Sequence, residues 1–335
     1  MPDQSQDRQE SGCAQMKYAR IPFVDQPVSR IILGGSGGRF LSGGDIGDIM
    51  DAALACGINA VDTARVYGRS EEALGRWLKE GQRRDRVVII SKGCHPSMAF
   101  HRRVNARAAG DDLKQSLEAL NTDHIDVSLL HRDDPSVPVG AILEFLNRFH
   151  EDGLIGAFGG SNWTAKRIAE ANAYAEEHGL AGFTVSSPHY SLGRQRHDPW
   201  GNGCKTATGG SHAEERRYYE DTQMPLVAWS SLCAGVFSGK LKSDEWGNLQ
   251  KTFGINTRWA YGCRDNRERL SRCEKLAEEK NASVAQIALA WILKDSMSVF
   301  PVIGASGPAR VRENAAAADI GLSDREYAWL NLEEE

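Results

Sequence analysis

The sequence predicts a parallel (β/α)8 barrel, or TIM barrel, with long loops at its C-terminal face. Eight short apolar segments alternate with segments whose apolar residues recur at helical spacing, which indicates parallel strands joined by helices. Eight such units in 335 residues fit one closed barrel domain over residues 17–335. An open, doubly wound sheet is the alternative, but residues 34–38 read Gly-Gly-Ser-Gly-Gly and lack the G-x-G-x-x-G fingerprint of that fold.

The expected strands share a short apolar run, which is typical of parallel strands that are buried on both faces. The first is expected at residues 31–35, after a charged, hairpin-like segment at residues 17–30. The other seven are expected at residues 60–61, 87–90, 125–130, 155–158, 183–187, 226–229 and 299–303.

Helices are expected between these strands, where apolar residues fall three or four positions apart. Gly57 and Gly153 are expected to end two of them. The helix before the last strand opens with the capping-box residues Ser283 and Gln286. One helix begins at Ser70, and the apolar faces of the others lie at residues 46–54, 113–120, 142–149, 165–177 and 284–292.

Two longer segments interrupt this alternation, at residues 193–222 and at residues 238–263. Both follow strands, so in a barrel both are expected over the C-terminal face, where long loops shape a substrate pocket. A lobe packed on the surface is the alternative for each segment.

Composition argues against several classes of protein. The formal net charge is -5, with no block of like charge, so nucleic acid is not an expected partner. Hydrophobic residues make up 41% of the chain, and no run approaches the roughly 18 apolar residues of a membrane span. Seven cysteines without a C-x-x-C pair indicate reduced thiols in a cytoplasm. Residues 1–16 are polar and are expected to form a disordered leader.

Polar side chains follow three consecutive strands of the predicted barrel. Asp62 comes directly after the second strand, and Tyr67 lies about one turn beyond it. Lys92 follows the third strand and His131 follows the fourth. Each has an ordinary alternative, such as an exposed turn or a buried structural histidine. Because the carboxyl ends of parallel strands meet at one rim, we expect the four side chains to lie together.

This grouping suits the protonation of a carbonyl oxygen. Free tyrosine titrates near pH ~10, and a nearby ammonium such as Lys92 is expected to lower the pKa of Tyr67. A buried lysine needs a carboxylate partner to stay charged, and Asp62 can supply it. His131 can orient the carbonyl or relay the proton. Because no side chain supplies a hydride, the set implies a nicotinamide cofactor.

The DTAxxYGxSE motif at residues 62–71, followed by Lys92 and His131, resembles the aldo-keto reductase superfamily. The resemblance extends from about residue 17 to the C-terminus, and the motif is highly specific. It implies a (β/α)8 barrel and NAD(P)(H)-dependent interconversion of a carbonyl and an alcohol. Tyr67 would be the general acid/base, Asp62 and Lys92 its tuning pair, and His131 the substrate-orienting group.

The resemblance also implies a set of cofactor contacts. Ser161 and Asn162 match the pair that bonds the nicotinamide carboxamide, and Trp229 matches the ring that stacks on the nicotinamide. Ser187 departs from the pattern, since a longer glutamine usually stands in its place. The loop expected over the pyrophosphate contains Ser230, Leu232, Gly235 and Lys240. The segment expected at the adenosine end contains Gly304, Ser306, Arg310, Glu313 and Asn314.

Within that last segment, Ser306 and Arg310 suit the 2′-phosphate of NADP(H), because guanidinium groups match phosphate geometry. Gly304 stands where some relatives carry a lysine. NADP(H) is therefore the predicted cofactor and NAD(H) the alternative.

The leading functional hypothesis is an oxidoreductase that acts on a small molecule. The Trp, Tyr and His residues of segment 193–222 suit a sugar, or a small aldehyde or ketone. A non-catalytic, cofactor-binding regulatory subunit is the alternative, because some relatives serve membrane channels in that way. A metal-dependent hydrolase would need His-x-His or clustered carboxylates at the strand ends; the sequence has neither, so no metal site is predicted. Oligomeric state stays open.

Overall fold

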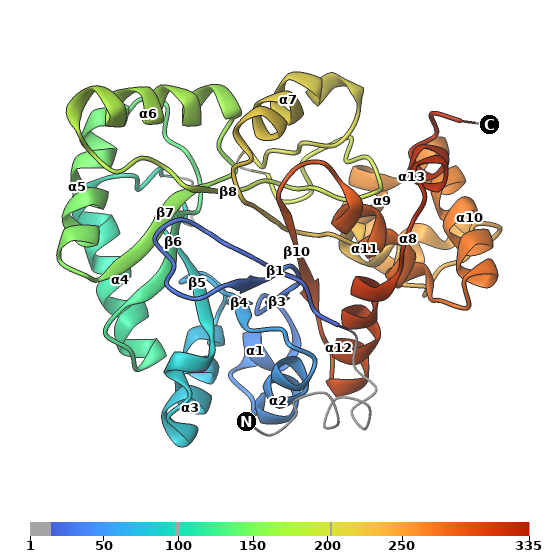
Figure 1. Cartoon of the computed structure of the whole chain (residues 1–335), viewed down its shortest axis with the longest axis horizontal. Helices are drawn as coiled ribbons and strands as arrows, with labels where there is room; N and C mark the ends of the chain where they lie inside the picture. Colours follow the sequence, from blue (N-terminus) through green and yellow to red (C-terminus); the bar gives the residue numbers. More distant parts are fainter. Residues whose placement is uncertain (1–14, 98–100, 202, 335) are drawn as a thin grey trace, which may run out of the picture.

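A closed barrel of eight parallel strands forms the centre of the computed structural model, which describes residues 15–97, 101–201 and 203–334 (Figure 1). The strands pair in the order β10-β3-β4-β5-β6-β7-β8-β9, so each predicted unit lies beside the next along the chain. The predicted (β/α)8 barrel is therefore confirmed. Its strands are β3 Ile32–Gly34, β4 Ala60–Asp62, β5 Val88–Gly93, β6 Ile125–Leu130, β7 Ile155–Ser161, β8 Val185–Ser187, β9 Leu226–Ala228 and β10 Val299–Gly304.

Helices surround the barrel and occupy the positions where helical spacing predicts them (Figure 1). Ser283 and Gln286 form both bonds of the predicted capping box at the start of α11. The predicted helices are α2 Gly47–Ala55, α3 Ser70–Gly81, α4 Ala106–Leu120, α5 Val139–Glu151, α6 Ala165–His178 and α11 Val284–Lys294.

Other helices lie where the sequence patterns did not predict any. The longest is α10, whose buried Leu270, Cys273 and Leu276 are separated by many charged residues, so its apolar face is narrow. These helices are α1 Gly38–Ser42, α7 Ala213–Thr222, α8 Leu249–Phe253, α9 Ile255–Tyr261, α10 Arg264–Glu279, α12 Pro308–Ala315 and α13 Asp324–Leu330. Short 3-10 turns are η1 Arg84–Arg86, η2 Gly210–His212, η3 Cys233–Gly235, η4 Trp246–Asn248 and η5 Ala316–Asp319.

Two apolar layers hold the barrel together. On β5, Val88 and Ile90 belong to the cluster inside the barrel, whereas Ile89 belongs to the cluster between the strands and the helices. This alternation follows from the pleat of a strand, which sends successive side chains to opposite faces. Because both faces are buried, the strands read as continuous apolar runs in the sequence.

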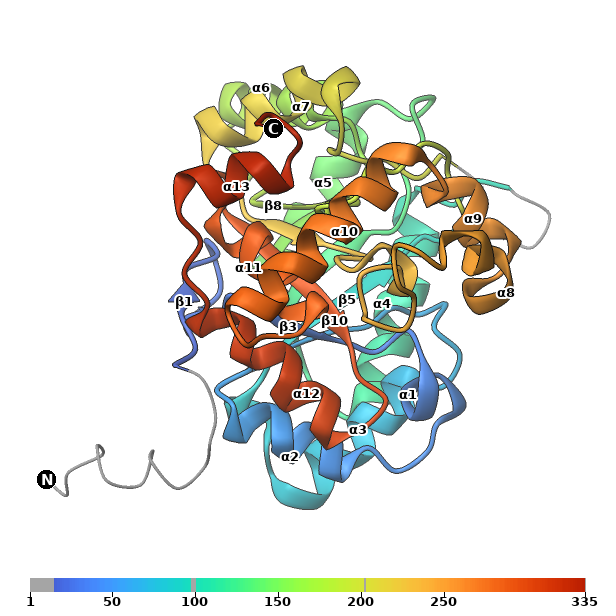
Figure 2. The same cartoon turned by 90° about the vertical axis from the view of Figure 1, so that its right-hand side faces the viewer.

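An N-terminal hairpin, β1 Tyr18–Ala19 and β2 Val28–Ser29, lies in the segment that was expected to be hairpin-like. Its Ile21, Val24 and Val28 join the cluster inside the barrel and so close the N-terminal end. In Figure 2 the hairpin lies on one side of the barrel and helices α8 and α9 lie on the other. The predicted leader falls mainly on residues 1–14, outside the described residues, but its last residue, Met16, is buried against the outer layer.

The two long segments are not the simple loops that were expected. The last third of residues 193–222 is α7, and its Tyr219 is buried with its hydroxyl 3.0 Å from Ser186 Oγ. Residues 238–263 contain α8 and α9. The segments meet where the ring of His197 stacks on Trp259, with ring centres 4.6 Å apart. Parts of the two segments therefore pack against each other, and both segments contribute residues to the C-terminal face of the barrel.

Strand β7 passes very close to β8 at Gly159, two residues before Ser161 at the C-terminal end of β7. A Cβ atom on Gly159 would lie 1.8 Å from the backbone oxygen of Val185, which is held in a paired strand. We expect Gly159→Ala to lower the unfolding free energy by about 3 kcal/mol, measured by urea denaturation. At Gly247 an added methyl group meets no atom within 4 Å, so Gly247→Ala is the matched control. Equal stability of the two variants would contradict the described strand pairing.

Candidate active site

An ion pair between Asp62 and Lys92 lies at the C-terminal end of the barrel. Asp62 ends β4 and pairs in register with Ile90, so Lys92 stands two residues further along the neighbouring strand β5. Lys92 Nζ donates to Asp62 Oδ1 at 2.5 Å and to the backbone oxygen of Thr63 at 2.9 Å. Both charged side chains are buried. The register of two parallel strands therefore creates this contact directly.

Burial and the charge of the partner shift the pKa of each residue of this pair in opposite directions. Burial alone would lower the pKa of Lys92, but the carboxylate of Asp62 and the hydroxyl of Tyr67 together outweigh it and raise the pKa above its ordinary value. Burial also raises the pKa of Asp62, against the opposing charge of Lys92. The proton therefore stays on the lysine at neutral pH, as the sequence argument expected.

Tyr67 lies in the turn between β4 and α3, with its ring over the ammonium of Lys92. Lys92 Nζ is 5.0 Å from the centre of the ring. The next residue, Gly68, has φ +54, and a Cβ there would lie 2.7 Å from the backbone oxygen of Leu41. Only glycine fits this turn without strain, and the turn directs Tyr67 toward Lys92.

The pKa of Tyr67 differs from the sequence expectation. Burial, the largest effect, raises it above its ordinary value together with the charge of Asp62, and the two outweigh the lowering by Lys92 and Arg132. The expected contribution of Lys92 is present, but the prediction of a lowered pKa is wrong for the protein alone, because the cost of burying a phenolate dominates. Tyr67 is thus fully protonated at neutral pH and able to donate.

His131 follows β6 and stands edge-to-face to Tyr67, with ring centres 5.7 Å apart. Burial, together with the charges of Lys92 and Arg132, holds its pKa well below its ordinary value. A second ring, His95, lies 4.8 Å from His131 and places its Nδ1 2.9 Å from the backbone oxygen of Pro96. His131 is therefore a neutral hydrogen-bonding group at physiological pH.

Glu71 joins the turn that carries Tyr67 to strand β5, which carries Lys92. It is buried in the first turn of α3, where it accepts a bond from Ser91 Oγ at 2.7 Å and pairs with Arg65. The backbone nitrogen of Arg65 in turn donates to the backbone oxygen of Lys92 at 3.0 Å. The turn that carries Tyr67 is thereby attached to the strand that carries Lys92.

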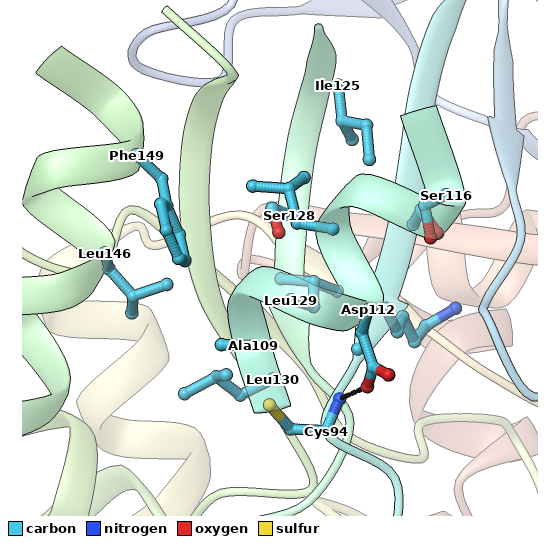
Figure 3. A pocket seen from close by; sticks show the side chains of 14 residues that line it. Cys94, Ala109, Asp112, Ser116, Ile125, Ser128, Leu129, Leu130, Leu146 and Phe149 are labelled. Atoms are coloured by element: carbon cyan, nitrogen blue, oxygen red, sulfur yellow. Dashed lines mark hydrogen bonds between the residues drawn. The ribbon is translucent and has the colours of Figure 1, made fainter. Parts of the chain in front are cut away.

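Asp112 supports the end of β5 from a second side. It accepts the backbone N–H of Cys94 at 2.8 Å, and Arg103 binds its two oxygens at 3.0 and 2.8 Å. Figure 3 shows Asp112 reaching from α4 to Cys94 beside a small internal cavity of about 20 Å³ that Lys92 also lines. These bonds fix the backbone immediately after Lys92.

A cavity of about 770 Å³ opens at this end of the barrel and is lined by all four residues of the predicted proton-transfer group. Most of the predicted cofactor contacts line it as well: Ser161, Asn162, Trp229, Ser230, Leu232, Gly235, Lys240, Gly304, Ser306, Arg310 and Asn314. The structure thus brings together residues that are more than 200 positions apart in the chain.

Two predicted contacts do not line this cavity. Ser187 is buried at the end of β8, where its backbone oxygen accepts from Ser161 Oγ and from the backbone nitrogen of Asn162, each at 3.1 Å. Glu313 lies one turn from Arg310 on α12, and its Oε2 accepts a hydrogen bond from Arg310 Nη1 at 2.7 Å. Both residues thus hold cavity-lining residues in place and do not face the cavity themselves.

The lining of the cavity suits a cofactor that has a flat ring and phosphate groups. Trp229 contributes an aromatic ring to the cavity wall, and Lys240, Ser306 and Arg310 contribute hydrogen-bond donors. The side-chain oxygen of Asn314 is buried without a partner in the described structure, and it lies on the cavity wall. Cations, hydroxyls and an orphaned acceptor are the groups that a nicotinamide dinucleotide would use.

Among the cavity residues that were not predicted from the sequence are His95, Arg132 and Cys204. His95 and Arg132 lie just beyond predicted strand ends, so the same rule that identified Lys92 and His131 points to them. Trp200 and Phe253 are among the aromatic residues of the two long segments that were expected at this face, and both line the cavity.

Within residues 15–97, 101–201 and 203–334, no group of three or more His, Cys, Asp or Glu residues is placed to hold a metal ion. None of the helices in the same ranges combines the length and the apolar character that crossing a bilayer requires.

Comparisons with known proteins agree with this geometry. A profile of the Aldo/keto reductase family matches residues 30–331. The chain is 28% identical over 335 positions to an uncharacterized oxidoreductase, YrpG, of Bacillus subtilis (strain 168), covering 94% of this chain and 95% of that one. It is 29% identical to a probable voltage-gated potassium channel subunit beta of Arabidopsis thaliana, covering 91% and 92%. It is 27% identical to a putative aryl-alcohol dehydrogenase of Schizosaccharomyces pombe, covering 84% and 83%.

The Asp62–Lys92 pair can be tested by stability alone. Lys92→Met leaves a buried carboxylate without its counter-ion, and we expect the unfolding free energy to fall by about 3–5 kcal/mol. The double variant Asp62→Leu/Lys92→Met removes both charges and is expected to regain most of that loss. Urea denaturation of the four proteins in this cycle gives the coupling. Additive effects of the two single changes would show that the pair does not form.

Proposed function

This chain belongs to the aldo/keto reductase family, and from that premise we propose that it interconverts carbonyls and alcohols with NAD(P)(H). One observation carries the proposal: the Lys92–Asp62 ion pair lies beneath Tyr67, in the same cavity as His131. A buried cation under a protonated phenol is the arrangement that a proton donor to a carbonyl needs.

In the reducing direction, Tyr67 donates its proton to the carbonyl oxygen. The raised pKa of Tyr67 keeps that proton in place until charge develops on the oxygen. Lys92 then stabilises the phenolate that forms, and Asp62 keeps Lys92 charged. His131 is neutral and orients the carbonyl oxygen by a hydrogen bond. In the oxidising direction the phenolate of Tyr67 accepts the hydroxyl proton.

The bound nicotinamide dinucleotide supplies the hydride, which no side chain can provide. We propose that Ser161 and Asn162 hold its carboxamide and that Trp229 stacks against its ring. Ser230, Leu232, Gly235 and Lys240 surround its pyrophosphate, and Gly304, Ser306, Arg310 and Asn314 surround its adenosine end. Glu313 acts there through its ion pair with Arg310. Ser187 acts through Ser161 and Asn162, since its backbone oxygen bonds both.

NADP(H) is the preferred nucleotide in this proposal. Arg310 and Ser306 line the cavity and follow β10, across the barrel from the β6 end that carries His131, and a 2′-phosphate would lie beside them. The ion pair between Arg310 and Glu313 holds the guanidinium in one orientation, although a bound phosphate must then share Arg310 with that carboxylate. NAD(H) remains the alternative cofactor.

The substrate is proposed to be a sugar or a small aldehyde or ketone. Trp200 of segment 193–222 and Phe253 of α8 line the cavity with flat apolar surface, which suits the hydrocarbon face of such a molecule. We further propose that the enzyme works in the cytoplasm, which the free thiols of Cys94, Cys204, Cys233, Cys263 and Cys273 support.

A cofactor-binding regulatory subunit without turnover is the second candidate. The similarity to a probable voltage-gated potassium channel subunit beta favours it. The two candidates differ in a single measurement, because a regulatory subunit would bind NADPH and leave every carbonyl compound unreduced.

Removing one hydroxyl tests the catalytic proposal. Tyr67→Phe is expected to lower kcat by about 10²–10⁴-fold, because the proton donor is lost while the ring remains. NADPH oxidation with a panel of sugars and aldehydes gives the rate, and NADPH fluorescence gives cofactor binding, which should persist. Tyr174→Phe makes the same change on α6, outside the cavity, and should keep full activity. Turnover that persists in Tyr67→Phe would refute the mechanism.

Nucleotide preference is tested at Arg310. Arg310→Leu is expected to raise KM for NADPH by about tenfold or more and to leave KM for NADH nearly unchanged, because only NADPH carries the 2′-phosphate. Arg312→Leu, on the exposed side of the same helix, is the matched control. Equal changes in the two KM values would overturn the role assigned to Arg310.

A further inference from the structure

Arg132 is a buried cation beside the reacting group that the proposed mechanism does not use. It directly follows His131 at the end of β6, lines the cavity and is only 8% exposed. Its Nη1 donates to the backbone oxygen of His131 at 2.8 Å and its Nη2 to Cys204 Sγ at 3.1 Å. Its Nε is buried without a partner among the described residues. The guanidinium thus keeps unused donor capacity.

No carboxylate neutralises Arg132 in the described part of the chain. The two acidic residues that follow it have other partners: Asp133 faces Arg167 at 3.5 Å, and Asp134 faces Arg102 at 3.5 Å. Among the residues that line the cavity, Asp62 alone is acidic, and Lys92 already neutralises it. A buried cation without a counter-ion is costly, which points to an anion supplied from outside the protein.

The position of Arg132 separates it from the phosphates of the proposed cofactor. In the closed barrel, β6 lies four strands from β10 in either direction, so the two strands face each other across the ring. Ser306 and Arg310 follow β10, whereas Arg132 shares the β6 end with His131. Trp200 and Cys204 line the same cavity, and Cys204 touches Arg132. Arg132 therefore belongs to the substrate end of the cavity.

We propose that Arg132 binds the carboxylate of the substrate, so that this protein acts preferentially on aldehydes or ketones that carry a carboxylate. The planar guanidinium matches a carboxylate, and its charge strengthens the hydrogen bonds between them. This inference rests on the proposed function. The carbonyl carbon gains a hydride from the reduced nicotinamide, and its oxygen gains a proton from Tyr67. The carboxylate of the substrate is not changed by the reaction. Arg132 thus sets specificity and takes no part in the transfer.

Matched pairs of substrates test the inference. Carboxybenzaldehyde and formylbenzamide have nearly the same shape and differ in charge, and their meta and para isomers vary the distance between aldehyde and anion. With NADPH, we expect kcat/KM for at least one acid to exceed that of its amide by about tenfold or more. In Arg132→Leu that ratio should fall to about one, whatever happens to the absolute rates, and Arg132→Lys should restore part of it.

Arg102→Leu is the control, because Arg102 is an exposed guanidinium near the same loop that does not line the cavity. It should keep the wild-type ratio. Wild-type reduction of amides and acids at equal efficiency would overturn the inference and leave the proposed function intact. A preference for acids that survives in Arg132→Leu would overturn the role of Arg132. If neither NADPH nor NADH supports reduction of any of these aldehydes, the proposed function fails and the inference fails with it.

Discussion

The buried ion pair between Lys92 and Asp62 is the interaction on which the rest of the site depends. A lone ammonium at this depth would lose its proton, and a lone carboxylate would gain one. Held 2.5 Å apart by the register of two parallel strands, both stay charged. The pair places a fixed positive charge under Tyr67, where negative charge would develop. Glu71 and Asp112 then stabilise the backbone on either side of it.

The barrel makes this possible because its two ends are built differently. The N-terminal hairpin fills one end with apolar side chains, including Ile21 and Val28. The other end is left to polar residues and is partly covered by the linked segments that contain His197 and Trp259. Chemistry is therefore confined to one face, and residues from distant parts of the chain meet there because every parallel strand ends on that face.

The strands, and the meeting of Asp62, Tyr67, Lys92 and His131 in one cavity, could be predicted from sequence because both follow simple rules. Apolar runs indicate the strands, and polar residues just past them mark the site. Helix α10 was not predicted, because many charged residues stand between the few apolar residues of its buried face. Arg132 was not predicted either, although it directly follows His131. The pKa of Tyr67 could not be read from sequence at all. It depends on how completely the folded chain surrounds the ring, and that burial exceeds the effect of the neighbouring lysine.

The cavity therefore contains two buried cations in different electrostatic situations. Lys92 has its counter-ion built into the chain, so its charge is available for every substrate. Arg132 has none among the described residues, although Asp133 and Asp134 follow it directly and face other arginines. Burying a guanidinium without a carboxylate lowers stability, and a carboxylate could have been placed one residue away. A cost of this kind at the wall of a cavity is best explained by binding, because a substrate anion would supply the negative charge that Arg132 lacks.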